Sequence, residues 1–214
     1  MILSRGRKYL FIHAPKTGGT SMALALEARA MKDDMMLGDT PKARQRRGRL
    51  KDVQTAGRLW KHSTLADLDG LVQTEELDDL FIFTLVRNPW DRMVSYYHWL
   101  QAQDFAHPSV TLAKTVSFEA FVADPAIARS FAQAPAASYV TDVQGCVRAD
   151  LFIRLEHFAH DIRPLEAHLG FALSLPHVNK SDRAADYRSA YSEQSRSAVA
   201  TMCARDIADF GYAF

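Results

Sequence analysis

The chain has 214 residues, of which 48% are hydrophobic, so it can bury the core of one compact α/β domain over residues 1–214. Its 26 basic and 25 acidic side chains give a formal net charge of +1. A dedicated nucleic-acid-binding domain is normally plainly basic, so we expect no nucleic-acid partner. This balance still allows a local basic pocket for a small polyanion.

Cysteine content and hydropathy predict a soluble, cytoplasmic protein. Cys146 and Cys203 lack a CxxC spacing, so we expect no disulfide framework and interpret both as small buried hydrophobic residues. No apolar stretch approaches the ~20 residues that a membrane-spanning helix requires. The apolar run at residues 9–12 is too short for a signal-peptide core and is interpreted as a first strand.

Three apolar runs, at residues 9–12, 80–86 and 151–155, predict buried strands. Each is followed by a predicted helix, and these helices cover residues 22–27, 90–103 and 157–169. Thr20 or Ser21 is the expected cap of the first helix, Gly170 ends the third, and a last helix is expected over residues 192–209. Alternating strands and helices indicate an α/β fold with a central, mainly parallel sheet flanked by helices.

Residues 31–61 show no clear periodicity and contain a concentrated run of basic residues. We interpret this segment as a solvated, mobile loop, and a surface for an acidic acceptor is the alternative. The basic residues are Lys42, Arg44, Arg46, Arg47, Arg49 and Lys51.

The first loop, residues 13–21, joins a predicted strand to a predicted helix and has the composition of an anion-binding site. Gly18 and Gly19 allow the backbone to approach an anion, toward which the N–H groups of the first helical turn point. Lys16 adds a positive charge, but it precedes the glycines, so the loop is not a Walker A motif. Hydroxyl donors are added by Thr17, Thr20 and Ser21.

The second loop begins with Arg87, at the end of the second predicted strand, where its guanidinium can bind a phosphate bidentately. Ser95 follows eight residues later (95 − 87 = 8), about two helical turns away, so both side chains can face one ligand. Asp91 and Arg92 are interpreted as an ion pair that supports this loop.

Together, the two loops resemble the cofactor-binding motifs of sulfotransferases that use 3′-phosphoadenosine 5′-phosphosulfate (PAPS). Residues 15–21, Pro-Lys-Thr-Gly-Gly-Thr-Ser, resemble the 5′-phosphosulfate loop, and Arg87 with Ser95 resembles the 3′-phosphate motif. The likeness is greatest to the carbohydrate sulfotransferase branch, which includes heparan 2-O-sulfotransferase. The resemblance implies a P-loop-type three-layer domain, PAPS as sulfuryl donor, no metal, and a small-molecule or carbohydrate acceptor.

The C-terminal stretches, residues 175–181 and 206–214, are similar to the tail of bacterial members of the same branch. By family position, Asn179, Lys180 and Ser181 close over the nucleotide. Local turns are the alternative role for these three residues.

Lys16 and His62 are the catalytic residues that the resemblance implies. Lys16 offsets charge on the leaving bisphosphate. His62 precedes Arg87 by 25 residues (87 − 62 = 25), where this branch places a catalytic base, and a helix-capping or surface role is its alternative. His13 is the second candidate base, with packing beneath the glycine loop as its other role.

Two other functions remain open at this point. A P-loop-type small-molecule or nucleotide kinase would require a phosphate donor and Mg²⁺, and the residue order around Lys16 argues against it. A non-catalytic nucleotide-binding paralogue would bind the bisphosphate without transfer to any acceptor. A lipid, a small alcohol or a tyrosyl group also remains open as the acceptor.

Overall fold

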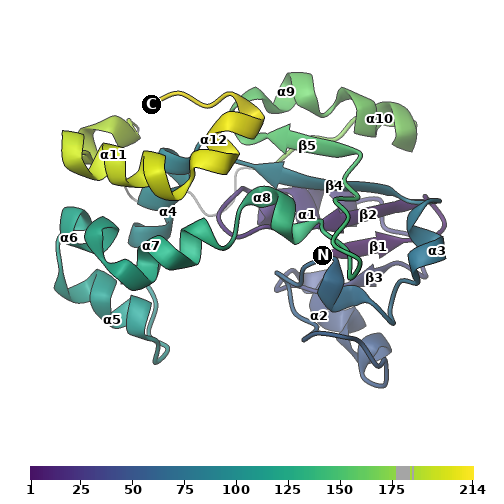
Figure 1. Cartoon of the computed structure of the whole chain (residues 1–214). Coiled ribbons are helices and arrows are strands. Elements are labelled where there is room, and N and C mark those ends of the chain that lie inside the picture. Colours follow the sequence, from purple (N-terminus) through teal and green to yellow (C-terminus); the bar gives the residue numbers. More distant parts are fainter. Residues whose placement is uncertain (177–183, 185) are drawn as a thin grey trace. The chain divides into compact units, whose positions relative to one another are not determined.

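The computed structural model describes residues 1–176, 184 and 186–214. Contacts group them into two compact units (Figure 1). The first unit contains residues 1–86 and the described part of 136–178, and the second contains residues 87–135 and the described part of 179–214. The first unit holds the sheet, and the second is helical.

The sheet of the first unit has five described strands in the order β3-β1-β2-β4-β5. β2, β4 and β5 are parallel, with Ile12 paired to Thr84 and Val86 to Arg154, which confirms the three predicted strands and the mostly parallel sheet. β1 is antiparallel to both β2 and β3 and was not predicted, because it and β3 are too short to show a period. The strands are β1 (Ile2–Ser4), β2 (Tyr9–Ile12), β3 (Met35–Met36), β4 (Phe81–Val86) and β5 (Leu151–Arg154).

Both faces of this sheet are buried, as expected for an α/β fold. Leu10 and Ile12 of β2 belong to a core cluster that also contains Leu65. Phe11, on the opposite face, belongs to a second cluster with Met22 of α1 (Gly19–Glu27). Packing on both faces confirms the predicted layered α/β architecture.

Three helix predictions for the first unit need correction. Gly18, in a left-handed conformation, is the N-cap of α1, so neither Thr20 nor Ser21 caps this helix. The basic segment is helical rather than a mobile loop, because Thr40 and Pro41 form a helix start and Ala43 and Leu50 are buried. The helix predicted over 157–169 is divided, although Gly170 ends it as predicted. The elements are α2 (Pro41–Arg46), η1 (Arg47–Leu50), η3 (Leu155–His157), α9 (Phe158–Asp161) and α10 (Arg163–Leu169).

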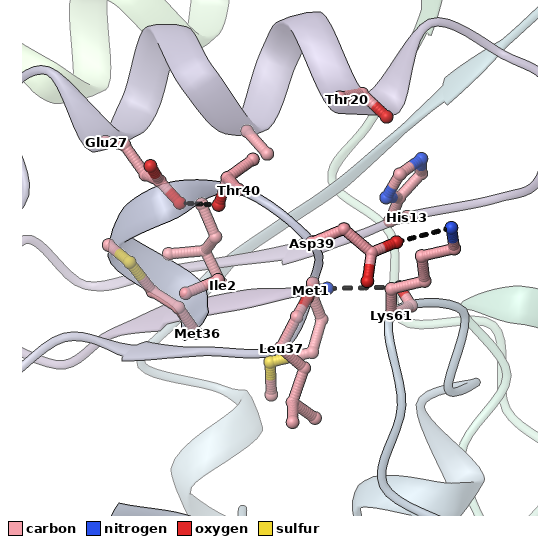
Figure 2. Close-up of a pocket in the computed structure, with 13 residues that line it drawn as sticks. Met1, Ile2, His13, Thr20, Glu27, Met36, Leu37, Asp39, Thr40 and Lys61 are labelled. Carbon is pink, nitrogen blue, oxygen red and sulfur yellow. Dashed lines mark hydrogen bonds and ion pairs between the residues drawn. The ribbon is translucent and has the colours of Figure 1, made fainter. Parts of the chain in front are cut away.

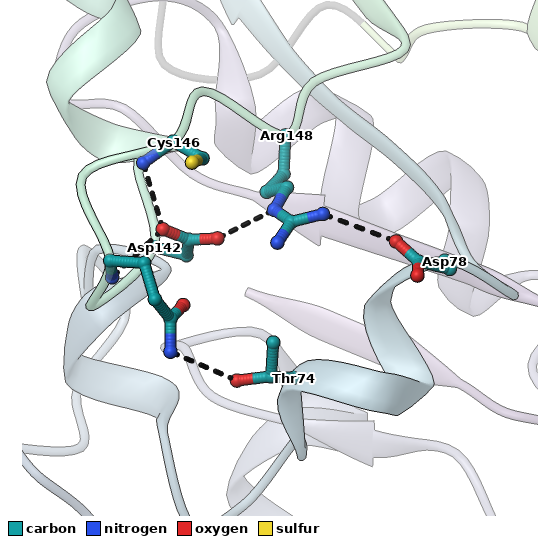
Figure 3. Close-up of polar contacts among 6 residues, drawn as sticks. Thr74, Asp78, Asp142, Cys146 and Arg148 are labelled. Carbon is teal, nitrogen blue, oxygen red and sulfur yellow. Dashed lines mark hydrogen bonds and ion pairs between the residues drawn. The ribbon is translucent and has the colours of Figure 1, made fainter.

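A polar network stabilises another loop of the first unit (Figure 3). The Asp142 carboxylate accepts hydrogen bonds from the backbone N–H of Cys146, at 2.8 Å, and from Arg148 Nε. Arg148 also pairs with Asp78 at 3.1 Å, just after α3 (Thr74–Leu77). Cys146 is exposed, which corrects its interpretation as buried. The remaining short elements of this unit are η2 (Ala66–Leu68) and α8 (Ala136–Tyr139).

The second unit packs its helices around an aromatic core that includes Trp90, Tyr97 and Phe121. The helix predicted over 192–209 is two helices, with the break at the buried Cys203. No helix in the described parts of the chain combines the length and apolar character needed to cross a membrane. The helices are α4 (Pro89–Gln101), α5 (Pro108–Thr115), α6 (Phe118–Ala123), α7 (Pro125–Ala132), η4 (Tyr187–Ala190), α11 (Glu193–Met202) and α12 (Ala204–Phe210).

Candidate cofactor and catalytic site

The glycine loop of the first unit has two residues with left-handed backbone conformations. Lys16 has φ 65° and Gly18 has φ 87°. Left-handed residues in such a turn direct successive N–H groups into a concavity that suits an anion. The Thr17 hydroxyl donates a 2.8 Å hydrogen bond to the Ala14 carbonyl, and Thr17 is buried, so its side chain holds the turn together. The loop leads directly into the N-terminus of α1, where Thr20 and Ser21 are half-buried.

The ring of His13 packs beneath this loop, as one of its two interpretations predicted. A Cβ placed on Gly19 would lie only 1.9 Å from His13 Cδ2, so the close approach requires glycine. The ring also stacks on Phe11, with centroids 5.9 Å apart. Burial, followed by the nearby His62, holds the pKa of His13 well below its ordinary value, and Lys61 and Lys16 add to this effect. His13 is therefore neutral at physiological pH.

The ring of His62 is fixed against the same strand end. Its Nδ1 lies 2.8 Å from the His13 carbonyl oxygen, which can only accept, so Nδ1 carries the proton and Nε2 has the lone pair. The two histidine rings meet edge to face at 4.6 Å. Burial lowers the pKa of His62 to about 4 despite the hydrogen bond to His13. His62 is thus a neutral, oriented imidazole near neutral pH, as a general base must be.

A shallow recess lies beside His13 in the first unit (Figure 2). His13, Thr20, Asp39 and Lys61 supply polar groups to its lining. Lys61 Nζ pairs with Asp39 Oδ2 at 2.7 Å, and both charges act on His62, Lys61 lowering its pKa and Asp39 raising it. Sequence reasoning missed Asp39 and Lys61, and the one available signal was that Lys61 precedes His62.

The second motif lies in the other unit. Arg87 donates from Nε to Asp91 Oδ2 at 2.8 Å, and its Nη2 lies 2.7 Å from the same oxygen. Asn88 caps α4 by accepting from Trp90 N at 3.1 Å. Ser95 is buried on α4, four residues after Asp91 and therefore on the same helical face. This face can present a guanidinium and a hydroxyl to one phosphate.

The predicted Asp91–Arg92 ion pair is wrong. Asp91 pairs with Arg87 because residues four apart share a helical face, whereas adjacent residues point in different directions. Arg92 is buried in the second unit, where its Nη1 lies 3.8 Å from Asp206 Oδ2 and its guanidinium lies over the Phe131 ring.

The structure brings Lys16, His13 and His62 together within the first unit. In the second unit it pairs Arg87 with Asp91 and buries Ser95 on α4. Asn179, Lys180 and Ser181 lie outside the described residues. Within the described ranges, no three or more His, Cys, Asp or Glu side chains gather in a group able to hold a metal ion.

Comparison with known proteins identifies a family and similar solved structures. The model of the sulfotransferase family matches residues 1–213. The crystal structure of mouse sulfotransferase SULT7A1 complexed with PAP is 20% identical in sequence, with a TM-score of 0.46. The match covers 95% of this chain and 66% of the mouse chain, just under two thirds of its length. No curated protein matches significantly. Since the family model spans nearly every residue, the chain belongs to the sulfotransferase family, as its two motifs predicted.

Proposed function

We propose that this protein transfers a sulfuryl group from PAPS to an acceptor hydroxyl. The observation that carries the proposal is the hydrogen bond between His62 Nδ1 and the carbonyl oxygen of His13, which immediately precedes the glycine loop. This contact joins an oriented base to an anion-binding turn that contains Lys16. An enzyme that hydrolyses acyl or phosphoryl groups would not need a site for a 3′-phosphate. This sequence has, besides the base and the glycine loop, a motif at Arg87 and Ser95 that resembles such a site.

In this proposal, each residue has a defined task. Lys16 and the N–H groups at the start of α1 hold the 5′-phosphosulfate, and Thr17 keeps the loop closed. Arg87 and Ser95 bind the 3′-phosphate, while Asp91 orients the Arg87 guanidinium. The recognition loop is completed by Gly18, Gly19, Thr20 and Ser21, and by Asn179, Lys180 and Ser181 from the C-terminal stretch.

Bound PAPS would supply the sulfuryl group, which passes to the acceptor oxygen as the bond from sulfur to the phosphate oxygen breaks. His62 Nε2 takes the acceptor hydroxyl proton, because Nδ1 already carries a proton donated to His13. Lys16 offsets the negative charge that develops on the departing 3′,5′-bisphosphate. Positioning and charge stabilisation thus supply most of the rate, by analogy with phosphoryl transfer.

Three further features belong to the proposal. The acceptor is a carbohydrate or another small hydroxyl compound, which is the substrate class that the family resemblance supports. The chain acts as a single sulfotransferase domain over residues 1–214. The protein works in the cytoplasm without a metal.

Lys16→Ala tests the role of the glycine loop. We expect it to lower sulfuryl transfer from PAPS by at least about 10²-fold, as loss of a transition-state charge partner does. Lys8→Ala is the matched control, because Lys8 is also a lysine with positive φ (53°) but lies in the β1–β2 turn. Normal turnover by Lys16→Ala, with Lys8→Ala also normal, would contradict the proposal.

A thermal-shift comparison of the wild-type protein with 3′,5′-bisphosphate (PAP), AMP and ATP tests the donor directly. A ligand that binds only the folded state raises the melting temperature. We expect PAP to produce the largest shift, without added magnesium. A shift produced by ATP alone, and only with magnesium, would indicate a kinase instead.

A further inference from the structure

The first turn of α4, which follows Arg87, is held by residues from the end of the chain. Figure 1 shows α4 beside α11 in the second unit, and the two helices share one aromatic core. The indole N–H of the buried Trp90 donates a 3.0 Å hydrogen bond to the Arg196 carbonyl. The Tyr191 hydroxyl donates one of 2.8 Å to the Trp90 carbonyl. Residues 101 and 106 positions later in the chain therefore fix the start of α4.

Asn88 makes a further link, to the tail formed by residues 213 and 214. Its Oδ1 accepts from the backbone N–H groups of Trp90, at 3.1 Å, and Asp91, at 3.5 Å, and so caps α4. Its Nδ2 donates a 2.9 Å hydrogen bond to the carbonyl oxygen of Ala213. Asparagine, aspartate and serine cap helices about equally well, but only asparagine adds an NH₂ group. The amide at position 88 therefore joins the helix start to the tail.

The Phe214 ring anchors this tail. It is half-buried and lies edge to face against three rings of the same unit, with centroids 5.4 Å from Tyr191, 5.6 Å from Trp90 and 5.9 Å from Tyr187. Edge-to-face pairs at such distances stabilise a ring beyond the effect of its buried area. Ala213 is itself exposed, so we infer that the ring next to it holds its carbonyl at Asn88.

The same helix start sets the direction of the Arg87 guanidinium. Asp91 lies in the first turn of α4, where Asn88 accepts from its backbone N–H. The Asp91 carboxylate holds the guanidinium through contacts of 2.8 Å to Nε and 2.7 Å to Nη2. Bidentate binding of a phosphate depends on the orientation of the planar guanidinium. A displaced first turn would therefore turn Arg87 away from the phosphate assigned to it.

We propose that Phe214 and Asn88 are positioning residues for the 3′-phosphate motif. The anchored tail holds Asn88, Asn88 holds the first turn of α4, and this turn directs Arg87. This inference rests on the proposed function and gives a task to the tail, which that function does not use. Loosening the tail should weaken binding of the 3′-phosphate specifically, because the 5′-phosphosulfate is assigned to the glycine loop of the first unit.

Asn88→Ser tests the link to the tail, because serine still caps α4 but lacks the amide donor to Ala213. Binding of PAP and of AMP to the full chain is measured by calorimetry. One neutral hydrogen bond is worth about 2- to 10-fold in affinity, so we expect the dissociation constant of PAP to rise by that factor. The dissociation constant of AMP should stay the same. An unchanged ratio of the two constants would overturn the inference.

Phe214→Ala removes the anchoring ring, and we expect the same specific loss of PAP affinity, whereas Phe214→Tyr keeps the ring and should bind PAP like the wild-type protein. Phe131→Ala is the matched control, because it removes another half-buried ring of this unit, which lies against the face of α4 that carries Arg92 and Tyr96. Its preference for PAP over AMP should be unchanged. An equal loss of preference in Phe131→Ala would indicate general loosening and overturn the inference. Should Phe214→Ala fail to fold, Asn88→Ser decides the question.

Steady-state transfer distinguishes positioning of the donor from a general structural role. Weaker binding of the 3′-phosphate raises KM for PAPS and leaves kcat nearly unchanged, because this contact is the same before and during transfer. A fall in kcat at an unchanged KM in Asn88→Ser would overturn the inference.

The wild-type protein separates this inference from the proposed function. Equal affinity for PAP and AMP would contradict the role of Arg87, and with it the proposed function. A wild-type preference for PAP that persists in both Asn88→Ser and Phe214→Ala would overturn the positioning role alone.

Discussion

The pH dependence of sulfuryl transfer should reveal the environment of His62. With its pKa at about 4, His62 is more than about 90% neutral at pH 5 and fully neutral at pH 7. A histidine with the ordinary pKa of about 6.5 would be only about 3% neutral at pH 5. We therefore expect kcat/KM to fall by only about a tenth from pH 7 to pH 5, and to be halved near pH 4. A fall of about 25-fold over the same interval would refute the buried, carbonyl-bound base.

The same pKa makes stability depend on pH. Because folding lowers the His62 pKa from about 6.5 to about 4, the unfolded chain binds more protons between these values, and stability decreases as the pH falls through that window. The loss from pH 7 to pH 5 is about 2 kcal/mol. His62→Asn keeps a donor for the His13 carbonyl but cannot titrate. Between pH 7 and pH 5, the free energy of unfolding of this variant in urea should therefore decrease by about 2 kcal/mol less than that of the wild-type protein. An unchanged slope would show that His62 is not desolvated. His13 titrates with the same sign in both proteins, because burial, the main cause of its lowered pKa, remains in the variant.

Two further substitutions test the two loops. Gly19→Ala would force the buried His13 ring aside and displace the carbonyl that holds His62, so we expect about 1–3 kcal/mol lower stability in urea unfolding and a severe loss of transfer. Gly48→Ala, where an added Cβ meets nothing within 4 Å, should be nearly neutral, and a neutral Gly19→Ala would contradict the packing described. Arg87→Ala should weaken PAP binding by about 10- to 100-fold in calorimetry but leave AMP binding unchanged; preserved discrimination between PAP and AMP would exclude Arg87 from the 3′-phosphate site.

The parallel strands were predictable from sequence because each is an apolar run long enough to be buried on both faces. Residues 81–86 and 151–154 can be recognised as strands without knowing which strands they pair with. The antiparallel strands at 2–4 and 35–36 contain three and two residues, so no period can appear in them. Only pairing between distant residues, such as Ile2 with Met36, defines them.

Several helices were overlooked although their start signals are present. His107 precedes Pro108, and Asp124 precedes Pro125, and both side chains accept hydrogen bonds from the first turn of the helix that follows. Thr40 before Pro41 marks the start of α2 by sequence, although its side chain makes no cap hydrogen bond to this helix. The basic composition of the segment after Pro41 suggested solvation, but buried Ala43 anchors it. Local helix signals were thus more informative there than charge.

The candidate site shows the same division between local and distant information. Lys16, Gly18 and Gly19 could be assigned from the loop alone, because their roles follow from charge and backbone freedom. The environment of His62 could not be assigned, because its partner, the His13 carbonyl, is 49 residues away. Spacing selected His62 as a base, but the tautomer and the lowered pKa follow only from that contact.

The backbone of Lys16 gives an independent reason to assign it a chemical task. A non-glycine residue in the left-handed region costs about 1–2 kcal/mol, and glycine would adopt φ 65° without that cost. At Lys8 the positive φ lies in the turn between two antiparallel strands, where such conformations match the strand twist. No hairpin imposes it at Lys16, which leads instead into the N-terminus of α1. A costly residue where glycine would fit is explained if its ammonium group is needed there, beside a bound anion.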